Sequence, residues 1–264
     1  MFETIEIERV GGAAHVWMNR PAVHNAFNAQ LIEELDAAWR QLGNDEAVRV
    51  VVLGGRGKSF SAGADLNWMK EAARYSETEN LADARRMADM LLKLAQLPKP
   101  TIARVHGAAL GGGTGLAAAC DICVASERAV FATSEVLFGI IPSAISPYVI
   151  RAIGARQANR YFQTAERIAP QRAVVLGLVH ELVADEDKLD TQIQSISDAL
   201  IKGGPNAQAA AKSLIAAVAA APIDEALAQE TAGLIARLRA TDEAREGLNA
   251  FLDKRQSSWC ADRA

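Results

Sequence analysis

The segment 104–115 contains three consecutive glycines, Gly111 to Gly113, between an apolar run and a stretch at 116–120 that is typical of a helix. Glycine is favoured near a helix start where φ must be positive or where another group must approach the main chain closely. A helix N-terminus presents free N–H groups and a partial positive charge, so it can hold an anion or an oxygen that becomes negative. The same pattern also fits a plain strand-to-helix turn or a loose dinucleotide loop.

A second loop of this kind lies earlier in the chain. Residues 48–53 form a near-continuous apolar run, typical of a strand buried on both faces, and Ala62-Gly63-Ala64-Asp65 follow after a glycine-rich turn. The glycine run itself follows a strand predicted at 101–105. Because parallel strands end at one edge of a sheet, where ligands bind, the two loops are expected to meet there. Two converging N–H donors would form an oxyanion hole.

The hydrophobic patterns predict an α/β protein with a helical end. Strands are predicted at 2–8, 13–18, 48–53, 101–105, 122–125 and 129–131, alternating with helices, which implies parallel strands and helical crossovers. Asn28 is expected to cap a helix, and the helix at 81–97 is expected to carry Ala84, Ala88, Leu91 and Ala95 on one stripe. We predict an α/β core over residues 1–200 and a C-terminal helical region over 201–264.

The later helices are expected at 145–153, 155–164, 170–176, 189–202, 206–219, 224–238 and 242–254, with a strand-like break at 178–183.

The chain has 264 residues, of which 50% are hydrophobic, so it can bury a large core. Its formal net charge of −4, with no basic block, disfavours nucleic acid or an anionic membrane as the main partner. No apolar run reaches the roughly 18 residues of a membrane span, and no signal-peptide pattern is visible, so we expect a soluble cytoplasmic protein.

Cys120 and Cys123 form a C-x-x-C pattern that could indicate a metal or redox site. Both cysteines lie in apolar runs, and neither a second cysteine pair nor a neighbouring histidine completes a zinc set. Buried structural thiols are therefore the preferred interpretation, and no metal is expected.

Five segments together resemble the enoyl-CoA hydratase/isomerase, or crotonase, superfamily. They are F-S-A-G-A-D-L at 60–66, G-A-A-L-G-G-G-T-G-L-A-A-A-C-D at 107–121, S-E-V-L-F-G-I-I-P at 134–142, N-R-P with N-A within 19–26, and F-L-D-K at 251–254. The resemblance implies the crotonase (ClpP-like) fold, in which repeated ββα units form a parallel-rich spiral. It also implies a coenzyme A thioester as the substrate, no further cofactor, and a homotrimer or dimer of trimers packed through the helical tail.

Carried over position by position, the resemblance assigns the oxyanion donors to the N–H groups of Ala64 and Gly112. These would hold the thioester oxygen as an enolate forms. Glu135 falls at the family's catalytic glutamate, where it could move a proton to or from water or carbon. Its apolar neighbours at 136–138 should raise its pKa above the reference value of about 4.3. An exposed glutamate at a helix start after Ser134 is the alternative.

The resemblance also implies further substrate contacts. Phe251 and Lys254 would meet the nucleotide end of coenzyme A, and Asp65 is expected to fix its loop rather than transfer protons. His106, beside the glycine run, is open to a ligand contact or a structural role. Lys70 and Arg74, four residues apart, are expected to share a helix face after the Ala64 loop, where they could meet a substrate carboxylate; a solvated charged face is the alternative. The remaining substrate-binding candidates are Ala22, His24, Ala26, Ala62, Asp65, Leu66, Leu110, Gly115 and Pro142.

The chain departs from the two-glutamate hydratase pattern of the family. Where those enzymes carry a second glutamate after the glycine run, this chain has Thr114 followed by Gly115. Ordered water or Thr114 are candidate replacements. Segments 61–69, 141–154 and 160–167 look closest to the bacterial 3-methylglutaconyl-CoA hydratase branch, which favours hydration of a branched, carboxylated 2-enoyl-CoA. The alternatives are an enoyl-CoA isomerase that uses Glu135, and a non-catalytic acyl-CoA- or RNA-binding module.

Overall fold

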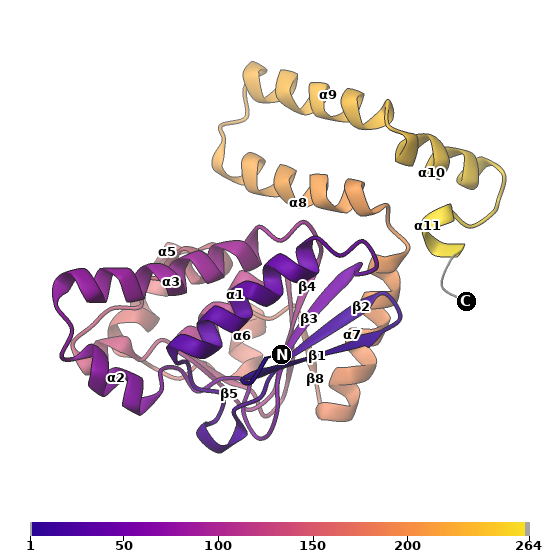
Figure 1. Ribbon diagram of the computed structural model, residues 1–264. Helices are drawn as coiled ribbons and strands as arrows, with labels where there is room; N and C mark the ends of the chain where they lie inside the picture. Colours follow the sequence, from indigo (N-terminus) through magenta and orange to yellow (C-terminus); the bar gives the residue numbers. More distant parts are fainter. Residues whose placement is uncertain (1, 262–264) are drawn as a thin grey trace.

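A six-stranded sheet forms the centre of the molecule, and the computed structural model describes residues 2–261 (Figure 1). All neighbouring strands are parallel except β1 and β2, which form an antiparallel pair. β5 (Ala108–Leu110) and β7 (Val130–Ala132) pair in parallel as a separate two-stranded sheet. The strands of the large sheet, in spatial order, are β1 (Ile5–Val10), β2 (Ala13–Met18), β3 (Val50–Gly55), β4 (Thr101–Val105), β6 (Ile122–Ser126) and β8 (Glu181–Val183).

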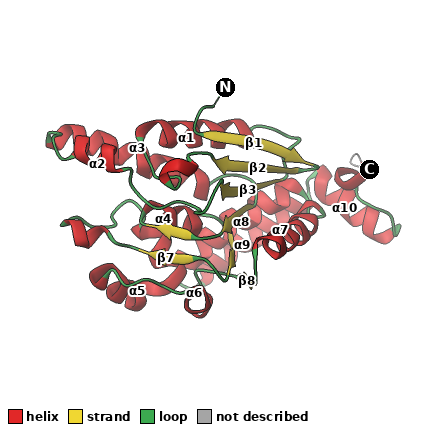
Figure 2. Cartoon of the chain, turned by 90° about the horizontal axis from the view of Figure 1, so that it is seen from below, coloured by secondary structure: helices red, strands yellow, loops and turns green. Residues whose placement is uncertain are grey.

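Helical layers cover both faces of this sheet, as the apolar run in β3 requires. Alternate β3 side chains belong to two different cores: Val51 lies in the core that includes α1 (Ala29–Gly43) and α3 (Glu77–Ala95). Val50 lies in the smaller core with α7 (Glu186–Ile201). Figure 2 shows these helices on opposite sides of the strands. This arrangement leaves only the ends of the strands free to build a site.

Local sequence signals set most helix starts. The Asn28 side chain accepts a hydrogen bond of 2.9 Å from the Leu31 amide and caps α1, as expected. Ser76 and Glu79 form a capping box at the start of α3. Of the stripe predicted for α3, Leu91 is buried and Ala88 and Ala95 are half-buried, whereas Ala84 is exposed. The buried residues of α3 are Asp83, Met87, Met90, Leu91 and Leu94.

The predicted α/β fold class is confirmed. Pairs of strands followed by a helix recur along the chain, from β1 and β2 with α1 to β6 and β7 with α5 (Ser146–Thr164). Several element bounds differ from the expectation: β1, for example, is Ile5–Val10 rather than 2–8, and α3 is Glu77–Ala95 rather than 81–97. The helix after the glycine run, α4, is Gly112–Ala119 and so begins inside the run rather than near residue 116. The two helices expected at 145–153 and 155–164 are confirmed as the two parts of α5, because Gly154 between them is non-helical, with φ 76° and ψ 153°.

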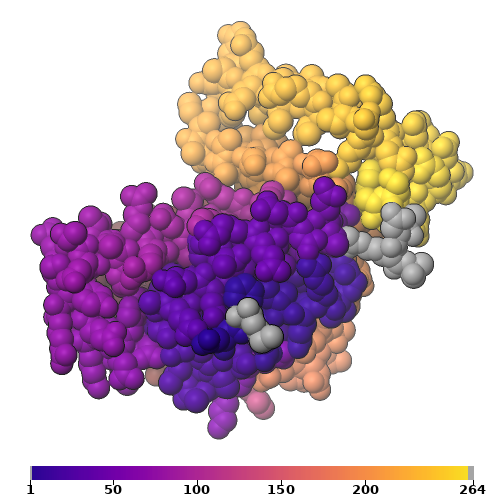
Figure 3. Space-filling view, in the orientation of Figure 1, coloured from indigo at the N-terminus to yellow at the C-terminus, as the bar shows by residue number. Residues whose placement is uncertain are grey.

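The last helices extend away from this body. They are α8 (Pro205–Ala220), α9 (Glu225–Arg239), α10 (Asp242–Leu252) and α11 (Ser258–Ala261). Neither α8 nor α9 has a buried residue, and Figure 3 shows an opening between their orange and yellow surfaces. α8 is attached to the body by Lys212, whose Nζ lies 2.8 Å from Asp121 Oδ2. This arm therefore exposes helix faces that the rest of the chain does not cover.

The cysteine pair is structural, as expected. Cys120 and Cys123 are both free and buried, and burial raises the pKa of the Cys120 thiol to about 12. Burial also raises the pKa of Cys123. Within residues 2–261, no cluster of three histidine, cysteine or carboxylate side chains is arranged to hold a metal ion. None of the helices in this range is long and apolar enough to cross a bilayer.

Candidate active site

The two glycine-bearing loops run side by side beyond the ends of β3 and β4. Ser61 is their meeting point: its amide donates to the Ala108 carbonyl at 3.0 Å, and its carbonyl accepts from the Leu110 amide at 2.9 Å. Ser61 and Ala109 therefore form a parallel bridge. A hydrogen-bonded ladder thus fixes the register between the loop that leads to Ala64 and the loop that leads to Gly112, as the parallel-sheet argument predicted.

Phe27 holds the first loop from the other side. The Phe27 amide donates to the Gly63 carbonyl at 2.7 Å, and the Phe27 carbonyl accepts from the Asp65 amide at 2.8 Å. These two bonds bracket Ala64, whose own N–H donates to no acceptor within residues 2–261. Ala64 is exposed. An N–H group held in this way is available to a ligand.

Asp65 fixes this loop. Its carboxylate accepts from the Asn67 amide at 2.8 Å, which caps α2 (Leu66–Ala72), and pairs with Arg20 at 2.9 Å. Burial opposes ionisation of Asp65, but these hydrogen bonds and the Arg20 charge hold its pKa below the usual range. Because both carboxylate oxygens are engaged, Asp65 is suited to holding the loop rather than to moving protons.

Gly111 sets the direction of the second loop. It has φ 50° and ψ −117°, a conformation that glycine adopts readily, and its amide donates to the Ala132 carbonyl at 2.8 Å. Gly112 then begins α4, is half-buried, and donates no hydrogen bond from its N–H to any acceptor in the described chain. A Cβ on Gly112 would lie 2.9 Å from the Phe27 ring and 3.0 Å from Met87 Cε. Phe27 and Met87, which the sequence patterns did not single out, therefore flank this donor.

Glu135 begins the short 3₁₀ helix η2 (Glu135–Phe138) and lies against the second loop. A Cβ built on Gly111 would be 3.1 Å from Glu135 Oε1 and 3.9 Å from Gly63 Cα. Glu135 Oε2 is buried and has no hydrogen-bond partner within residues 2–261. Burial raises the pKa of Glu135, as its apolar surroundings predicted. The structure thus brings this carboxyl group to Gly111, the residue before Gly112, and Gly63, the residue before Ala64, lies close to the same glycine.

The space that the side chain of a second glutamate at position 115 would need is filled by Ile145. A Cβ on Gly115 would lie 2.1 Å from Ile145 Cγ2 and 2.7 Å from Ile145 Cβ, so the isoleucine side chain lies directly on the glycine. Gly115 is one helical turn beyond Gly111, which places Ile145 and Glu135 on the same face of α4. An aliphatic wall therefore stands where a second carboxylate would be.

Thr114 does not replace that carboxylate. Its hydroxyl is fully buried, donates to the Ala109 carbonyl at 2.6 Å and accepts from the Ala132 amide at 3.3 Å. The group is used in joining β5 to β7. This excludes one of the two replacements suggested by the sequence.

We predict that Gly115→Ala lowers the free energy of unfolding by about 1–3 kcal/mol, because the new methyl group overlaps Ile145. Denaturant unfolding of the purified protein measures this change. Gly233→Ala in α9 is the matched control, because its nearest neighbour is the flexible end of Arg237 at 3.3 Å. The control should be neutral or gain up to about 1 kcal/mol. Equal midpoints for Gly115→Ala and the unaltered protein would contradict the tight contact.

Several of the residues predicted to contact pantetheine lie in or beside the first loop. Ala22 lies in the 3₁₀ helix η1 (Pro21–Val23), His24 follows that helix, and both residues are exposed. The His24 carbonyl accepts a hydrogen bond from the Ala62 amide at 2.9 Å. Ala26 is buried, Leu66 is 73% exposed, and Leu110 is half-buried. Pro142 is buried near Ile145, which precedes α5. The roles of these residues in binding remain predictions.

Two predicted contacts are not brought to this place within one chain. Phe251, 81% exposed, lies in α10 and Lys254 follows that helix, while α2, which follows the first loop, lies at the opposite side of Figure 1. The shared helix face expected for Lys70 and Arg74 is also wrong. α2 ends at Ala72, so Arg74 lies beyond the helix, although both cations are exposed.

Comparison with known proteins agrees with this fold. Residues 8–262 match the family model for enoyl-CoA hydratase/isomerase. A short-chain-enoyl-CoA hydratase of Clostridium acetobutylicum is 33% identical, with 95% of each chain covered. A 2,3-dehydroadipyl-CoA hydratase of Escherichia coli is 36% identical over 90% of this chain and 91% of the relative. A crystal structure of an enoyl-CoA hydratase from Shewanella pealeana superimposes with a TM-score of 0.95 at 41% identity, covering 98% of this chain and 96% of the other.

The recurring ββα units and the close superposition on the Shewanella pealeana structure define a crotonase-fold enzyme. The chain belongs to the enoyl-CoA hydratase/isomerase family.

Proposed function

We propose that this enzyme adds water to the conjugated double bond of a 2-enoyl-CoA thioester. The observation that carries the proposal is the adjacency of the two loops that carry Ala64 and Gly112, whose N–H groups bond to no acceptor among the described residues, with Glu135 beside Gly111 and its Oε2 without a partner there. Two N–H donors stabilise an oxygen that becomes negative, and a carboxylate within reach can move a proton. Both needs arise in the hydration of an α,β-unsaturated thioester.

In the proposed reaction, the thioester carbonyl oxygen accepts hydrogen bonds from Ala64 N–H and Gly112 N–H. Glu135 takes one proton from a water molecule as the water oxygen bonds to the β carbon. The π electrons of the double bond shift toward the thioester, so that negative charge collects on its oxygen as an enolate. Glu135 then returns the proton to the α carbon, which completes the addition of water. The reaction uses only water and groups of this chain, so activity should survive removal of metal ions by chelation.

We further propose a branched, carboxylated acyl group, with 3-methylglutaconyl-CoA as the specific candidate. Three sequence segments favour this branch, and the wall formed by Ile145 gives the acyl group an apolar surface to pack against. The Escherichia coli relative is named for a substrate whose acyl chain also ends in a carboxylate. An exposed cation such as Lys70 is a candidate to meet that carboxylate.

The second candidate function is double-bond isomerisation of a 3-enoyl-CoA. The observation that favours it is the occupation of the second-glutamate position by Ile145, which leaves one carboxylate to shuttle a proton between two carbons. We rank hydration first because the relatives compared above are named as hydratases.

A panel of thioesters separates these functions by absorbance of the conjugated enoyl thioester. We expect the enzyme to remove this absorbance, because hydration consumes the conjugated double bond. We expect a higher kcat/KM with 3-methylglutaconyl-CoA than with crotonyl-CoA. An isomerase would instead generate the absorbance from a 3-enoyl-CoA. Rapid gain from 3-enoyl substrates without loss from any 2-enoyl substrate would replace hydration by isomerisation. Equal kcat/KM for the two 2-enoyl substrates would remove the carboxylated, branched preference.

We also propose that the helical arm packs against other copies of the chain, in a trimer or a dimer of trimers. The arm exposes large apolar side chains, including Ile215 at 70% and Phe251 at 81%, and its α8 and α9 bury none of their residues. In such an assembly Phe251 and Lys254 could meet coenzyme A bound to a neighbouring subunit. The mass in solution, measured by light scattering, distinguishes a trimer or hexamer from a monomer.

A further inference from the structure

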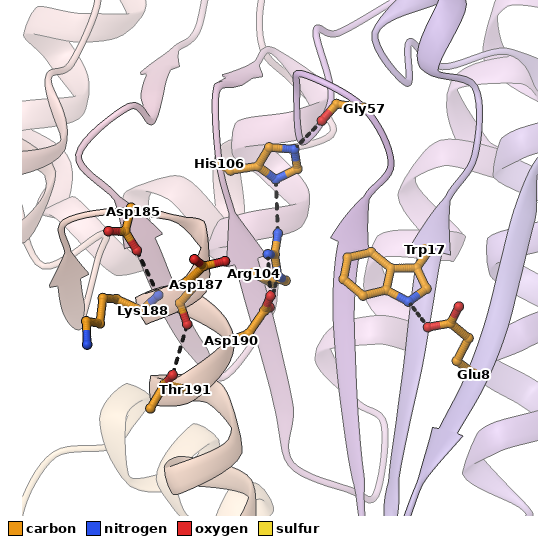
Figure 4. Close-up of polar contacts among 10 residues, drawn as sticks. All are labelled: Glu8, Trp17, Gly57, Arg104, His106, Asp185, Asp187, Lys188, Asp190 and Thr191. Carbon is orange, nitrogen blue, oxygen red and sulfur yellow. Dashed lines mark hydrogen bonds and ion pairs between the residues drawn. The ribbon is translucent and has the colours of Figure 1, made fainter.

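His106 joins the two oxyanion loops at the point where they leave the sheet. Its side chain is buried, with the residue 2% exposed, so it does not reach the ligand surface. Its ring nitrogen Nε2 lies 2.9 Å from the Gly57 carbonyl oxygen, and Nδ1 lies 3.3 Å from a guanidinium nitrogen of Arg104 (Figure 4). Gly57 belongs to the loop that leads to Ala64, whereas His106 begins the loop that leads to Gly112.

These two contacts fix the ring in one tautomer. A carbonyl oxygen only accepts, so Nε2 must carry the hydrogen that is donated to Gly57. A guanidinium only donates, so Nδ1 must be the unprotonated nitrogen that accepts from Arg104. Arg104 is held in turn by Asp190 of α7, with nitrogen–oxygen distances of 2.5 and 3.0 Å, and lies over the Trp17 ring at 5.3 Å. Both ring nitrogens are thereby satisfied and the orientation is set.

The main chain continues the same connection toward the donors. The Phe60 amide donates to the His106 carbonyl at 2.9 Å, one step before the Ser61 ladder. Gly107 has φ 59°, and a Cβ there would lie 2.1 Å from the Lys58 carbonyl oxygen, so the two loops touch at this point. Gly57 and Lys58 are themselves exposed. The His106 side chain is therefore a buried tether for the exposed, outer end of the first loop.

We propose that His106 is a positioning residue, which through its Nε2–Gly57 hydrogen bond sets the separation of the Ala64 and Gly112 amides. The proposal rests on the proposed function, because it assigns that separation to the thioester oxygen. Small displacements matter in such a site: a shift of about 1 Å can cost about 100-fold in rate. His106 acts here through the loops and does not touch the substrate.

Three substitutions of His106 separate this tether from a general packing role. In His106→Gln the side-chain amide nitrogen reaches the place of Nε2 and can still donate to Gly57. In His106→Asn the amide is one bond shorter, so it remains near Arg104 but leaves Gly57 unpaired, and His106→Leu loses both contacts. We expect kcat to fall about 10- to 100-fold in the Asn and Leu variants with KM within about threefold, and the Gln variant to stay within about threefold of wild type.

A spectroscopic readout reports the donors directly. A bound cinnamoyl-type CoA thioester absorbs at longer wavelength when its carbonyl is polarised by two N–H groups, and we expect the Asn and Leu variants to lose most of this red shift. The Gln variant should keep it. His180→Gln is the matched control, because that ring accepts from the Cys123 amide near the start of β6, at the opposite end of the strands.

The outcomes decide between the alternatives. Asn and Gln variants with equal kcat and equal red shift would overturn the proposal, and so would failure of both polar variants to fold. If His106→Leu alone fails to fold, the Asn–Gln comparison decides. If wild type binds and red-shifts the chromophore but turns over none of the enoyl substrates, the proposed function falls while the variant shifts still judge His106. No red shift in wild type overturns both.

Discussion

Replacement of Glu135 by glutamine is expected to lower kcat by about 10²–10⁴-fold, the usual contribution of a positioned acid or base. Glutamine keeps the size of the side chain but cannot take a proton from water. The two donor amides belong to other segments, and neither depends on the Glu135 side chain for a hydrogen bond. Affinity for a saturated acyl-CoA should therefore change little. Steady-state kinetics on the best 2-enoyl thioester, together with calorimetric titration of the saturated analogue, measure the two effects.

Glu127→Gln is the matched control, because Glu127 is an exposed glutamate in the turn after β6. It should leave kcat unchanged. Retention of full turnover by the Glu135→Gln protein would remove Glu135 from the mechanism. An equal loss of saturated acyl-CoA affinity and of turnover would instead make it a binding residue.

Because the pKa of Glu135 is raised, Glu135→Gln is expected to increase the stability of the protein although it lowers its activity. Because burial raises the folded-state pKa above the unfolded value, folding favours the protonated acid. The stability this provides is fully present below the unfolded pKa and is lost as pH rises through the folded pKa. Above the folded-state pKa the ionised group is therefore a net cost, and Glu135→Gln should raise Tm in that pH range while it lowers kcat. The Tm difference should shrink as the pH is lowered.

The raised pKa of Glu135 also determines how kcat/KM falls at acid pH. The proposed base must be ionised to take a proton from water, so kcat/KM should fall as pH drops through the raised pKa of Glu135. This fall should occur at a higher pH than for an ordinary exposed glutamate. A pH profile of kcat/KM measures it.

The sequence predicted those parts of the fold that depend on local chemistry. Asn28 as a cap and the buried run of β3 were both correct, because side-chain capping and hydrophobic pattern act within a few residues. The start of α4 was missed because glycine has poor helix propensity, and in this structure close packing overrides that preference. The stripe predicted for α3 included the buried Leu91 but missed Met87, Met90 and Leu94, which fill the rest of its core face.

In the candidate site, too, local motifs could be read from the sequence, whereas long-range contacts could not. Ala64, Gly112 and Glu135 were assigned through motif resemblance, and the structure places the segments that carry them beside one another. The packing of Ile145 on Gly115 could not be predicted, because it joins residues 30 positions apart and no local pattern encodes such a contact. The tether through His106 was equally hidden: the sequence showed a histidine beside the glycine run but not the Gly57 carbonyl that it meets.

Gly112→Pro is the substitution that most directly tests the oxyanion hole, because proline removes the backbone N–H. Gly112 is the first residue of α4, the position at which proline is best tolerated in a helix. Its N–H makes no hydrogen bond in the described chain, so its loss leaves no protein acceptor unpaired. We expect kcat to fall about 10²–10³-fold, the effect of removing one donor from such a site.

Gly112→Ala is the control that isolates the N–H group. Both variants add a Cβ that crowds the Phe27 ring at 2.9 Å and Met87 Cε at 3.0 Å, but only alanine keeps the donor. Kinetics measured side by side, with circular dichroism to check the fold, should give a proline variant far slower than the alanine variant. If the two are equally slow, steric crowding explains the loss and Gly112 is not a donor. If both keep wild-type kcat, the thioester oxygen must be held elsewhere.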